Sequence, residues 1–147
     1  MKPGNVLMVC LGNICRSPLA QGIFEHLLDN PTIQIDSAGT ANYHTGASPD
    51  KRSIATAKKH QIDISNQKAR QFLQADFDRF DHIFVMDREN LKNVLKLARN
   101  QEDRQKVRLL LGEEEVEDPY YGGLEGFETV YKKIYNACKS VLKEWKV

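Results

Sequence analysis

Cysteine is scarce in this sequence: the chain of 147 residues contains only Cys10, Cys15 and Cys138. An odd count with no signal-peptide pattern argues against a secreted scaffold held together by disulfides. The apolar run Val6–Val9 near the N-terminus is too short to cross a bilayer. We therefore expect a cytoplasmic protein with reduced thiols and no membrane insertion.

An excess of one charge, a cluster of metal ligands and interdomain linkers are also missing. The 21 basic and 20 acidic residues give a formal net charge of +1, so no strong field attracts nucleic acid. The histidines are scattered and predict neither a metal site nor a cofactor. No repeat or linker-like stretch interrupts the sequence, so residues 1–147 are expected to form a single domain.

Four apolar segments rich in β-branched residues predict buried strands. They are Val6–Cys10, Ile33–Asp36, His82–Met86 and Val107–Leu111. Strands that alternate with helical patterns predict an α/β fold with a four-stranded parallel sheet and helices on both faces.

The helices between these strands have recognisable boundary residues. Ser17-Pro18 is typical of a helix start, with serine as the cap, and Asn30-Pro31 is typical of a helix end. A second helix is expected from Ser48-Pro49, and Asp87 is expected to cap a third. A last helix carries one apolar stripe from Phe127 to Trp145.

The loop after the first strand is the predicted place for chemistry, because ligands bind beyond the carboxyl ends of parallel strands. This phosphate loop reads Cys10, Leu11, Gly12, Asn13, Ile14, Cys15, Arg16 and Ser17. Such a short connection between a strand and a helix can curl so that successive N–H groups point inward. Together with the positive end of the following helix, these N–H groups bind a tetrahedral oxyanion.

Three side chains of the phosphate loop suit phosphoryl transfer. Cys10 is expected at the bottom of the cup, where positive potential favours the nucleophilic thiolate and Ser17 can donate a hydrogen bond to it. Arg16 offers a planar fork of donors for two phosphoryl oxygens. We predict Cys10 and Arg16 as catalytic residues. The other loop residues, Leu11, Gly12, Asn13, Ile14, Cys15 and Ser17, are predicted to bind the substrate.

A cysteine at the end of a buried strand is usually an inert apolar residue. The combination of Cys10 with Gly12, Arg16 and Ser17-Pro18 at these spacings favours a reactive site instead. A nucleotide-binding P-loop is the obvious rival, but it ends in Gly-Lys-Ser/Thr, which this loop lacks, and no G-x-G-x-x-G motif occurs.

The phosphate loop resembles the signature loop of the low-molecular-weight protein tyrosine phosphatases, and the resemblance extends over essentially the whole chain. Further matching motifs are Asp36-Ser37-Ala38-Gly39, Ser48-Pro49-Asp50, Phe80-Asp81, Met86-Asp87 and Asp118-Pro119. The resemblance implies hydrolysis of phosphotyrosine through a cysteinyl-phosphate intermediate, without a metal or cofactor. It implies a tyrosine-phosphorylated protein as substrate, with a tyrosine kinase as a further partner to consider, and a monomer or weak dimer.

Asp118 is the candidate general acid and base. An Asp-Pro pair in a polar loop is ordinarily only a turn, and the match to the family's Asp-Pro motif is what favours catalysis. Tyrosine leaves poorly as a bare anion, so a positioned acid should accelerate the step by about 10²–10⁴-fold.

The resemblance also assigns the walls of the pocket. Ile14 and Tyr43 are the implied wall residues, and Ile14 favours phosphotyrosine because a threonine there is the family's indication of phosphoarginine specificity. Tyr120 and Tyr121 are implied to flank the cleft, where packing at the rim is an equally good interpretation. His44 is either on the same rim or a solvated surface residue.

Several neighbours complete the predicted site. Cys15 shares the phosphate loop with Cys10, and in the family this second cysteine forms a reversible disulfide; a structural cysteine is the alternative. Asp87 and Ser37 are candidates to brace the loop. Gln67 stands near the place where several family members have a histidine, which puts part of the bracing network in doubt.

Two other functions compete with this prediction. An arsenate reductase on the same fold needs a further reactive cysteine pair after the third strand, and residues 81–100 contain no cysteine. An inactive phosphate-binding module would need no acid, so Asp118 beside Cys10 and Arg16 argues against it. Cys138 lies on the apolar stripe of the last helix and is expected to be a core residue.

Overall fold

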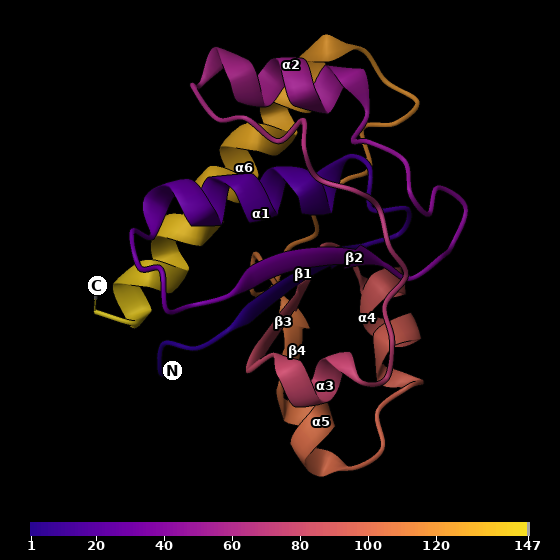
Figure 1. Cartoon of the computed structure of the whole chain (residues 1–147), viewed down its shortest axis with the longest axis vertical. Helices are drawn as coiled ribbons and strands as arrows, with labels where there is room; N and C mark the ends of the chain where they lie inside the picture. Colours follow the sequence, from indigo (N-terminus) through magenta and orange to yellow (C-terminus); the bar gives the residue numbers. More distant parts are fainter. Residues whose placement is uncertain (147) are drawn as a thin grey trace.

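A computed structural model describes residues 1–146 as strands that alternate with helices. The strands are β1 (Val6–Cys10), β2 (Ile35–Gly39), β3 (His82–Val85) and β4 (Val107–Leu109). The helices are α1 (Arg16–Leu27), α2 (Lys51–Lys59), α3 (Asp76–Arg79), α4 (Arg88–Leu95), α5 (Gln101–Gln105) and α6 (Leu124–Glu144). Figure 1 shows α1, α2 and α6 on one side of the sheet and α3, α4 and α5 on the other.

The four strands form one parallel sheet, as predicted, and their order in the sheet is β2-β1-β3-β4. The chain leaves β1 toward β2 on one side and later returns to β3 on the other side. The carboxyl end of β1 is therefore a topological switch point, where the connections diverge and leave a crevice. The phosphate loop begins at this point.

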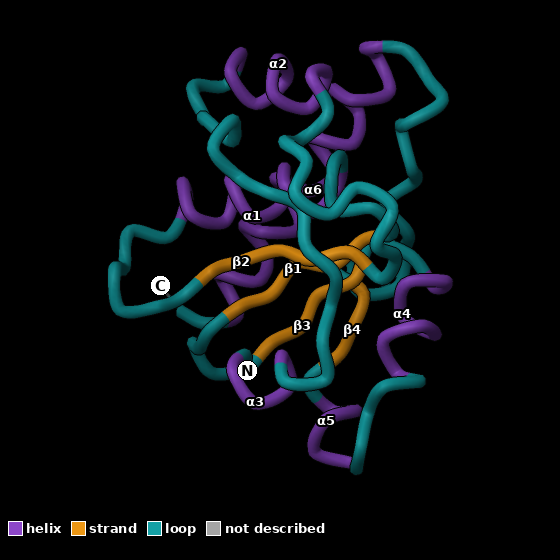
Figure 2. The backbone as a smooth tube through the Cα atoms, turned by 45° about the vertical axis from the view of Figure 1, so that its right-hand side comes forward, coloured by secondary structure: helices purple, strands orange, loops and turns teal. Residues whose placement is uncertain are grey.

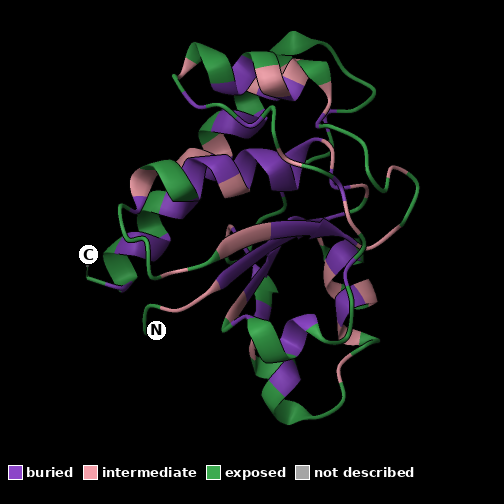
Figure 3. Cartoon of the chain, viewed as in Figure 1, coloured by how far each residue is buried: buried purple, intermediate pink, exposed green. Residues whose placement is uncertain are grey.

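Strand β1 is apolar throughout because the sheet is covered on both faces. All five of its residues are buried (Figure 3). Val6 and Met8 pack into the core beneath α1 and α6, whereas Leu7 and Val9 pack into the core beneath α3 and α4. This central position holds the carboxyl end of β1 in place from both faces.

Three predicted strand boundaries were wrong. Strand β2 runs from Ile35 to Gly39 rather than over Ile33–Asp36, because its pairing with β1 extends into small residues that carry no hydrophobic signal. Strands β3 and β4 end at Val85 and Leu109, earlier than predicted, because the last pair in their ladder joins these two residues. Of the apolar residues that follow in loops, Met86 and Leu110 are buried and Leu111 is partly buried.

The start of α1 differs from the prediction. Ser17 does not cap the helix: Cys15 occupies the cap position, no side chain caps it, and Ser17 is fully buried within the first turn. Helix α2 begins after Asp50, whose carboxylate accepts a hydrogen bond from Arg52 N, so the predicted start at Ser48-Pro49 was early.

The predicted cap of α4 is confirmed, because the Asp87 carboxylate accepts a hydrogen bond from Asn90 N in a capping box. Helices α3 and α5 were not predicted, because four and five residues are too few to show helical periodicity. In α6, the apolar stripe from Phe127 to Leu142 is buried, as expected, and packs against α1 and α2.

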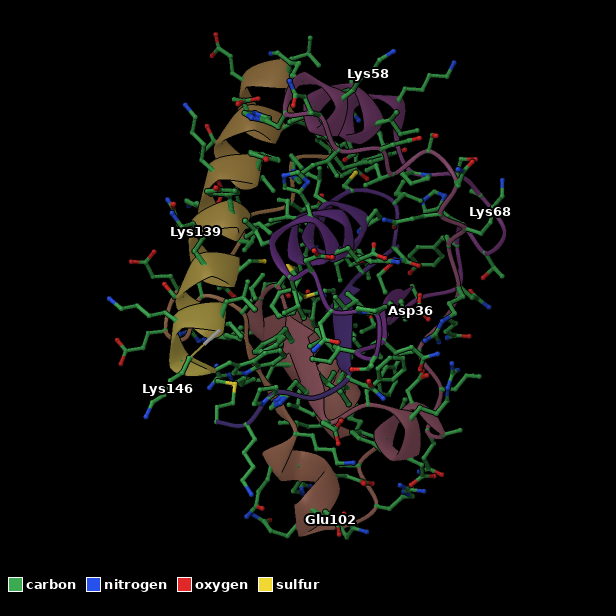
Figure 4. All side chains as sticks on the ribbon, turned by 60° about the vertical axis from the view of Figure 1, so that its left-hand side comes forward. Asp36, Lys58, Lys68, Glu102, Lys139 and Lys146 are labelled. Carbon is green, nitrogen blue, oxygen red and sulfur yellow. The ribbon has the colours of Figure 1, made fainter. Side chains whose placement is uncertain are left out.

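The surface is charged, as in an ordinary globular protein. Figure 4 shows Lys58, Lys68 and Glu102 pointing away from the body of the molecule. The long loop from α2 to α3 passes beside the strands (Figure 2). Within residues 1–146, no helix combines the length and the apolarity needed to cross a membrane.

Candidate active site

A cavity of about 350 Å³ opens at the carboxyl end of β1. Its lining comes from the phosphate loop, from the loop after β2 and from the loop of residues 110–123, here called the post-β4 loop. The lining residues are Cys10, Leu11, Gly12, Ile14, Cys15, Arg16, Tyr43, His44, Asp118, Tyr120 and Tyr121. Of the predicted site residues, only Asn13 and Ser17 do not line the cavity; both are buried behind it.

The phosphate loop is fastened through its carbonyl oxygens. Cys10 O and Leu11 O accept hydrogen bonds from Thr40 N and Ala41 N, each at 2.9 Å. Ile14 O accepts a hydrogen bond from Asp50 N (2.8 Å), and Cys15 O accepts one from Ser53 Oγ (3.2 Å). Among the hydrogen bonds of the described residues, none has a backbone N–H of residues 12–16 as its donor. These N–H groups are therefore available to bind an oxyanion in the cavity.

Two residues set the curvature of the phosphate loop. Asn13 adopts a left-handed backbone conformation with a φ of 57°. Gly39, at the end of β2, lies so close to the loop that a Cβ atom there would stand 2.8 Å from Leu11 O. A side chain at position 39 would push the loop away from the sheet.

The Asn13 side chain determines which way the Ser17 hydroxyl points. Asn13 Nδ2 donates to Ser17 Oγ (2.7 Å) and to Ser37 Oγ (3.0 Å). Because Ser17 Oγ already accepts this bond, its own hydrogen can point at Cys10 Sγ, 3.0 Å away, which is nearer than the other acceptor, Ala38 O at 3.5 Å. The hydroxyl is thus placed to donate a hydrogen bond to the sulfur of Cys10, which is 2% exposed at the cavity floor.

Arg16 is buried and held in one orientation. Its Nη1 donates to Asp87 Oδ2 (2.6 Å) and to Val116 O (2.9 Å). Burial lowers the pKa of Arg16, but Cys10 and Asp87 beside it outweigh burial and raise the pKa above its ordinary value. The Nε and Nη2 donors remain for two oxygens of a bound phosphoryl group.

Asp118 faces the same cavity from the post-β4 loop. Its Oδ2 lies 3.6 Å from Arg16 Nη2, and its Oδ1 accepts a hydrogen bond from Tyr120 N (3.0 Å). The side chain is 39% exposed, so it can reach both a ligand and water. The sequence separates Cys10 and Asp118 by more than a hundred residues, and the fold brings them to one cavity.

Cys15 differs from Cys10 although both lie in the phosphate loop. Burial, together with the negative charge of Asp50, raises the pKa of Cys15 to about 12, so its thiol stays protonated at neutral pH. Cys10, Cys15 and Cys138 are all free thiols in this structure. The reversible disulfide between Cys10 and Cys15 therefore stays a prediction.

The structure places the bracing residues around Asn13 and Arg16. Ser37 and Asp87 contact them directly, as described above. Gln67, near the place of the family's histidine, donates through Nε2 to Pro18 O (3.1 Å). Arg70 N donates to Asn13 Oδ1 (3.0 Å), so a backbone group completes the bonding of this amide.

Sequence reasoning missed Arg52 and Arg70. His44 does lie on the rim of the cavity, one of the two alternatives given for it, and a Cβ atom on Gly12 would lie 3.0 Å from His44 Cδ2. An arginine in the first turn of a surface helix or before a loop carries no local signal that separates it from a solvated charge. Arg52 donates to Tyr120 O and Arg70 donates to Asp36 Oδ2, and each of these acceptors lies tens of residues away along the chain.

An anion-binding cup with a thiol at its floor, at the carboxyl edge of a parallel sheet, defines an α/β protein built to hold a phosphoryl group. Comparison with known proteins makes this class specific. The family model described as low molecular weight phosphotyrosine protein phosphatase matches residues 5–146, and the chain belongs to this family.

Individual relatives agree over nearly the full chain. The low molecular weight phosphotyrosine protein phosphatase of Gallus gallus is 40% identical, over 95% of this chain and 94% of that protein. The crystal structure of a protein tyrosine phosphatase from Entamoeba histolytica is 34% identical, with a TM-score of 0.89 over 99% and 100% of the two chains. The Drosophila arginine phosphatase DARP, also 34% identical, gives 0.88 over 97% and 98%.

Proposed function

We propose that this protein hydrolyses phosphotyrosine in proteins, with Cys10 as nucleophile, Arg16 as phosphate ligand and Asp118 as general acid and base. The observation that carries the proposal is the meeting of these three side chains at one cavity. They come from the end of β1, the start of α1 and the post-β4 loop, and each has a different chemical role.

In the first step, the Cys10 thiolate attacks phosphorus, so that an S–P bond forms while the P–O bond to the tyrosine breaks. Asp118 donates its proton to the leaving phenolate oxygen. Arg16 and the free N–H groups of residues 12–16 hold the equatorial oxygens, on which negative charge is spread in the transition state.

In the second step, a water molecule attacks the cysteinyl phosphate. The Asp118 carboxylate, now deprotonated, takes a proton from this water, and the S–P bond breaks. Inorganic phosphate leaves and the Cys10 thiolate is restored. Every proton and bond in the cycle is accounted for by these side chains and water, so the proposal includes neither a metal nor a cofactor.

The walls of the cavity favour an aryl phosphate. Leu11, Ile14, Tyr43 and Tyr120 offer apolar and aromatic surface above a sulfur that is 2% exposed, which suits a flat ring long enough to reach it. The arginine phosphatase of Drosophila has the same fold, but the isoleucine at position 14 is the observation that favours phosphotyrosine here. Phosphoarginine is the substrate to compare in the same assay.

Neither competing function, arsenate reduction or phosphate binding without catalysis, fits the side chains of this protein as well. A cysteine relay for arsenate reduction requires a further accessible thiol, whereas Cys138 is completely buried in α6 and burial raises its pKa. A pure phosphate binder has no use for a half-exposed carboxylate 3.6 Å from the phosphate-binding arginine.

The cellular setting belongs to the same proposal. Three free thiols suit the reducing cytoplasm, where a tyrosine-phosphorylated protein is the substrate and a tyrosine kinase is a partner to examine. We propose a single domain over residues 1–147 that acts as a monomer or weak dimer.

Substitution of the nucleophile tests the proposed function most directly. With chelator present, the wild-type protein should hydrolyse p-nitrophenyl phosphate and a phosphotyrosine peptide. Cys10→Ser should lower kcat by about 10⁴-fold or more, because the alkoxide is not formed in its place. Its thermal unfolding temperature should still rise with added inorganic phosphate, which reports an intact cup. Turnover by Cys10→Ser, or none by the wild type, contradicts the proposal.

A further inference from the structure

We infer that Arg52 is a positioning residue that holds the post-β4 loop, and with it Asp118, at the working distance from the phosphate loop. This inference rests on the proposed function, in which Asp118 is the acid and base. Arg52 does not line the cavity, so its effect is indirect.

The first turn of α2 is fastened to the back of the phosphate loop. Asp50 N donates to Ile14 O (2.8 Å), and Ser53 Oγ donates to Cys15 O (3.2 Å). Both acceptors are carbonyls of the loop that forms the anion-binding cup. The first turn of α2, from which Arg52 projects, is therefore held in position by hydrogen bonds to the phosphate loop.

From the first turn of α2, the Arg52 guanidinium reaches the post-β4 loop. Its Nη2 donates to Tyr120 O (2.8 Å) and its Nη1 donates to Gly122 O (2.9 Å). The Asp50 carboxylate orients the fork, because Oδ1 accepts from Nε (3.0 Å) and Oδ2 accepts from Nη2 (2.9 Å). One guanidinium thus joins the two loops that carry the nucleophile and the acid.

Aromatic rings hold the guanidinium between the two loops. Its central carbon lies 4.5 Å from the centroid of the Phe127 ring, at the start of α6, and 5.6 Å from that of Tyr120. Phe127 is completely buried, whereas the Arg52 side chain is 32% exposed. These contacts limit the directions in which the fork can point.

The post-β4 loop has few other attachments near Asp118. Before it, Val116 N donates to Met86 O, Val116 O accepts from Arg16, and Glu117 accepts from Lys133 Nζ. After it, in the described chain, Arg52 makes the only side-chain hydrogen bonds that reach residues 119–123 from another element. Without Arg52, the described chain just after Asp118 would have packing contacts but no such hydrogen bond to hold it.

Arg52→Gln should therefore weaken acid catalysis and leave substrate binding unchanged. With phenyl phosphate, whose leaving group needs a proton, kcat/KM, which reports the first step, should fall by about 10- to 100-fold, because a small displacement of a catalytic group costs rates of this order. With p-nitrophenyl phosphate, whose leaving group needs little help, kcat/KM should fall less than about threefold. The KM of both substrates should stay within about twofold.

A double-mutant cycle with Asp118→Ala separates positioning from a general structural effect. If Arg52 acts through Asp118, adding Arg52→Gln to Asp118→Ala should lower kcat on phenyl phosphate by less than about twofold further. Arg52→Lys keeps the charge but lacks the fork, so it should show the same dependence on the leaving group as Arg52→Gln.

Arg108→Gln is the matched control. Arg108 also lies over an aromatic ring, 5.2 Å from the Phe84 centroid, and also pairs with a carboxylate, Glu144 at 3.4 Å, but it is outside the cavity lining. This variant should retain the wild-type kcat on both substrates, and thermal unfolding should report the fold of every variant.

Equal losses on both phenyl esters, an undiminished loss in the Asp118→Ala background, or full activity of Arg52→Lys would each overturn the inference. These outcomes differ from failure of the proposed function. In that case the wild type itself would lack turnover, or Asp118→Ala would show no dependence on the leaving group.

Discussion

The phosphate loop and the post-β4 loop face the same cavity but are held very differently. In the phosphate loop, Cys10, Asn13, Arg16 and Ser17 are buried, and four carbonyls accept hydrogen bonds from neighbouring segments. In the post-β4 loop, Asp118 is 39% exposed and Tyr121 is 94% exposed. One side of the site is embedded in the core, and the other is attached at a few points.

The difference follows from what each loop must do. A nucleophile and an anion-binding cup work through fixed geometry, because donors that do not reorganise stabilise charge most effectively. A residue that gives a proton to a leaving group and later takes one from water must remain accessible to both. Changes at Asp118 should therefore alter rate with little effect on stability, whereas changes under the phosphate loop should alter both.

The largest expected effect is a loss of catalytic rate, with little loss of stability, when Asp118 is substituted. Asp118→Ala should lower kcat/KM, which reports the first step, by about 10²–10⁴-fold on phenyl phosphate and by less on p-nitrophenyl phosphate, because only the poorer leaving group needs the proton. Its urea midpoint should stay near that of the wild type, since the carboxylate makes one local hydrogen bond and lies 3.6 Å from Arg16, which keeps Asp87 as its closer partner at 2.6 Å. The measurements are steady-state kinetics and urea unfolding.

Glu114→Ala, a change of an exposed carboxylate in the same loop, is the control and should leave kcat unchanged. Equal rate losses on the two substrates would remove Asp118 from the acid role. A large loss of stability would show that the post-β4 loop is part of the core, and the contrast between the two loops would disappear.

An effect of intermediate size is expected when glycine is replaced by alanine next to the phosphate loop, at Gly39, and this effect should be absent at Gly123 in the post-β4 loop. Gly39→Ala should lower the free energy of unfolding by about 1–3 kcal/mol and also reduce kcat, because its Cβ would stand 2.8 Å from Leu11 O. Gly123→Ala, before α6, meets no atom within 4 Å and should change stability by less than about 0.5 kcal/mol.

Urea unfolding and kcat on p-nitrophenyl phosphate measure this pair. The comparison fails if Gly39→Ala is tolerated as well as Gly123→Ala, because the phosphate loop would then have room to move.

The smallest effect concerns Glu117, which anchors the post-β4 loop to Lys133 on α6 through a 2.8 Å ion pair. The hydrogen bond from Lys133 lowers the pKa of Glu117, so the contribution to stability is present above the carboxyl group's ordinary pKa and is lost as the pH falls through the lowered value. Because both side chains are exposed, Glu117→Gln should cost less than about 1 kcal/mol at pH 7.

The stability difference between wild type and Glu117→Gln should shrink in high salt and vanish at strongly acidic pH. Urea unfolding at several pH values and salt concentrations provides the measurement. A difference that grew as the pH fell would have the wrong sign for this ion pair.

Much of the site could be predicted because the phosphate loop is contiguous in sequence. Cys10, Arg16 and Ser17 stand within eight residues, and the flanking strand and helix signals are local. Even here, the role of Ser17 as a helix cap was wrong. Its hydroxyl lies against the sulfur of Cys10 rather than a helix N–H, because burial of the loop gives it a nearer partner.

Residues outside the loop were predicted less completely. Asp118 was identified through the family motif, since an Asp-Pro pair alone indicates only a turn. Arg52 and Arg70 were missed, because their partners lie on other elements and a charged residue on a helix or loop has no periodic signal. The end of β2 at Gly39 was missed because small residues pair in a sheet without raising hydrophobicity.

The alternation of strands and helices, the central apolar strand and the composition of the anion-binding loop can be read from local sequence patterns. Hydrophobic pattern and turn chemistry act over a few neighbouring residues, and a linear chain displays them directly. Long-range folding establishes which carboxylate stands beside Arg16, where Gly39 meets the loop and which carbonyls Arg52 holds. Those contacts depend on the strand order β2-β1-β3-β4, which brings together segments separated by tens of residues.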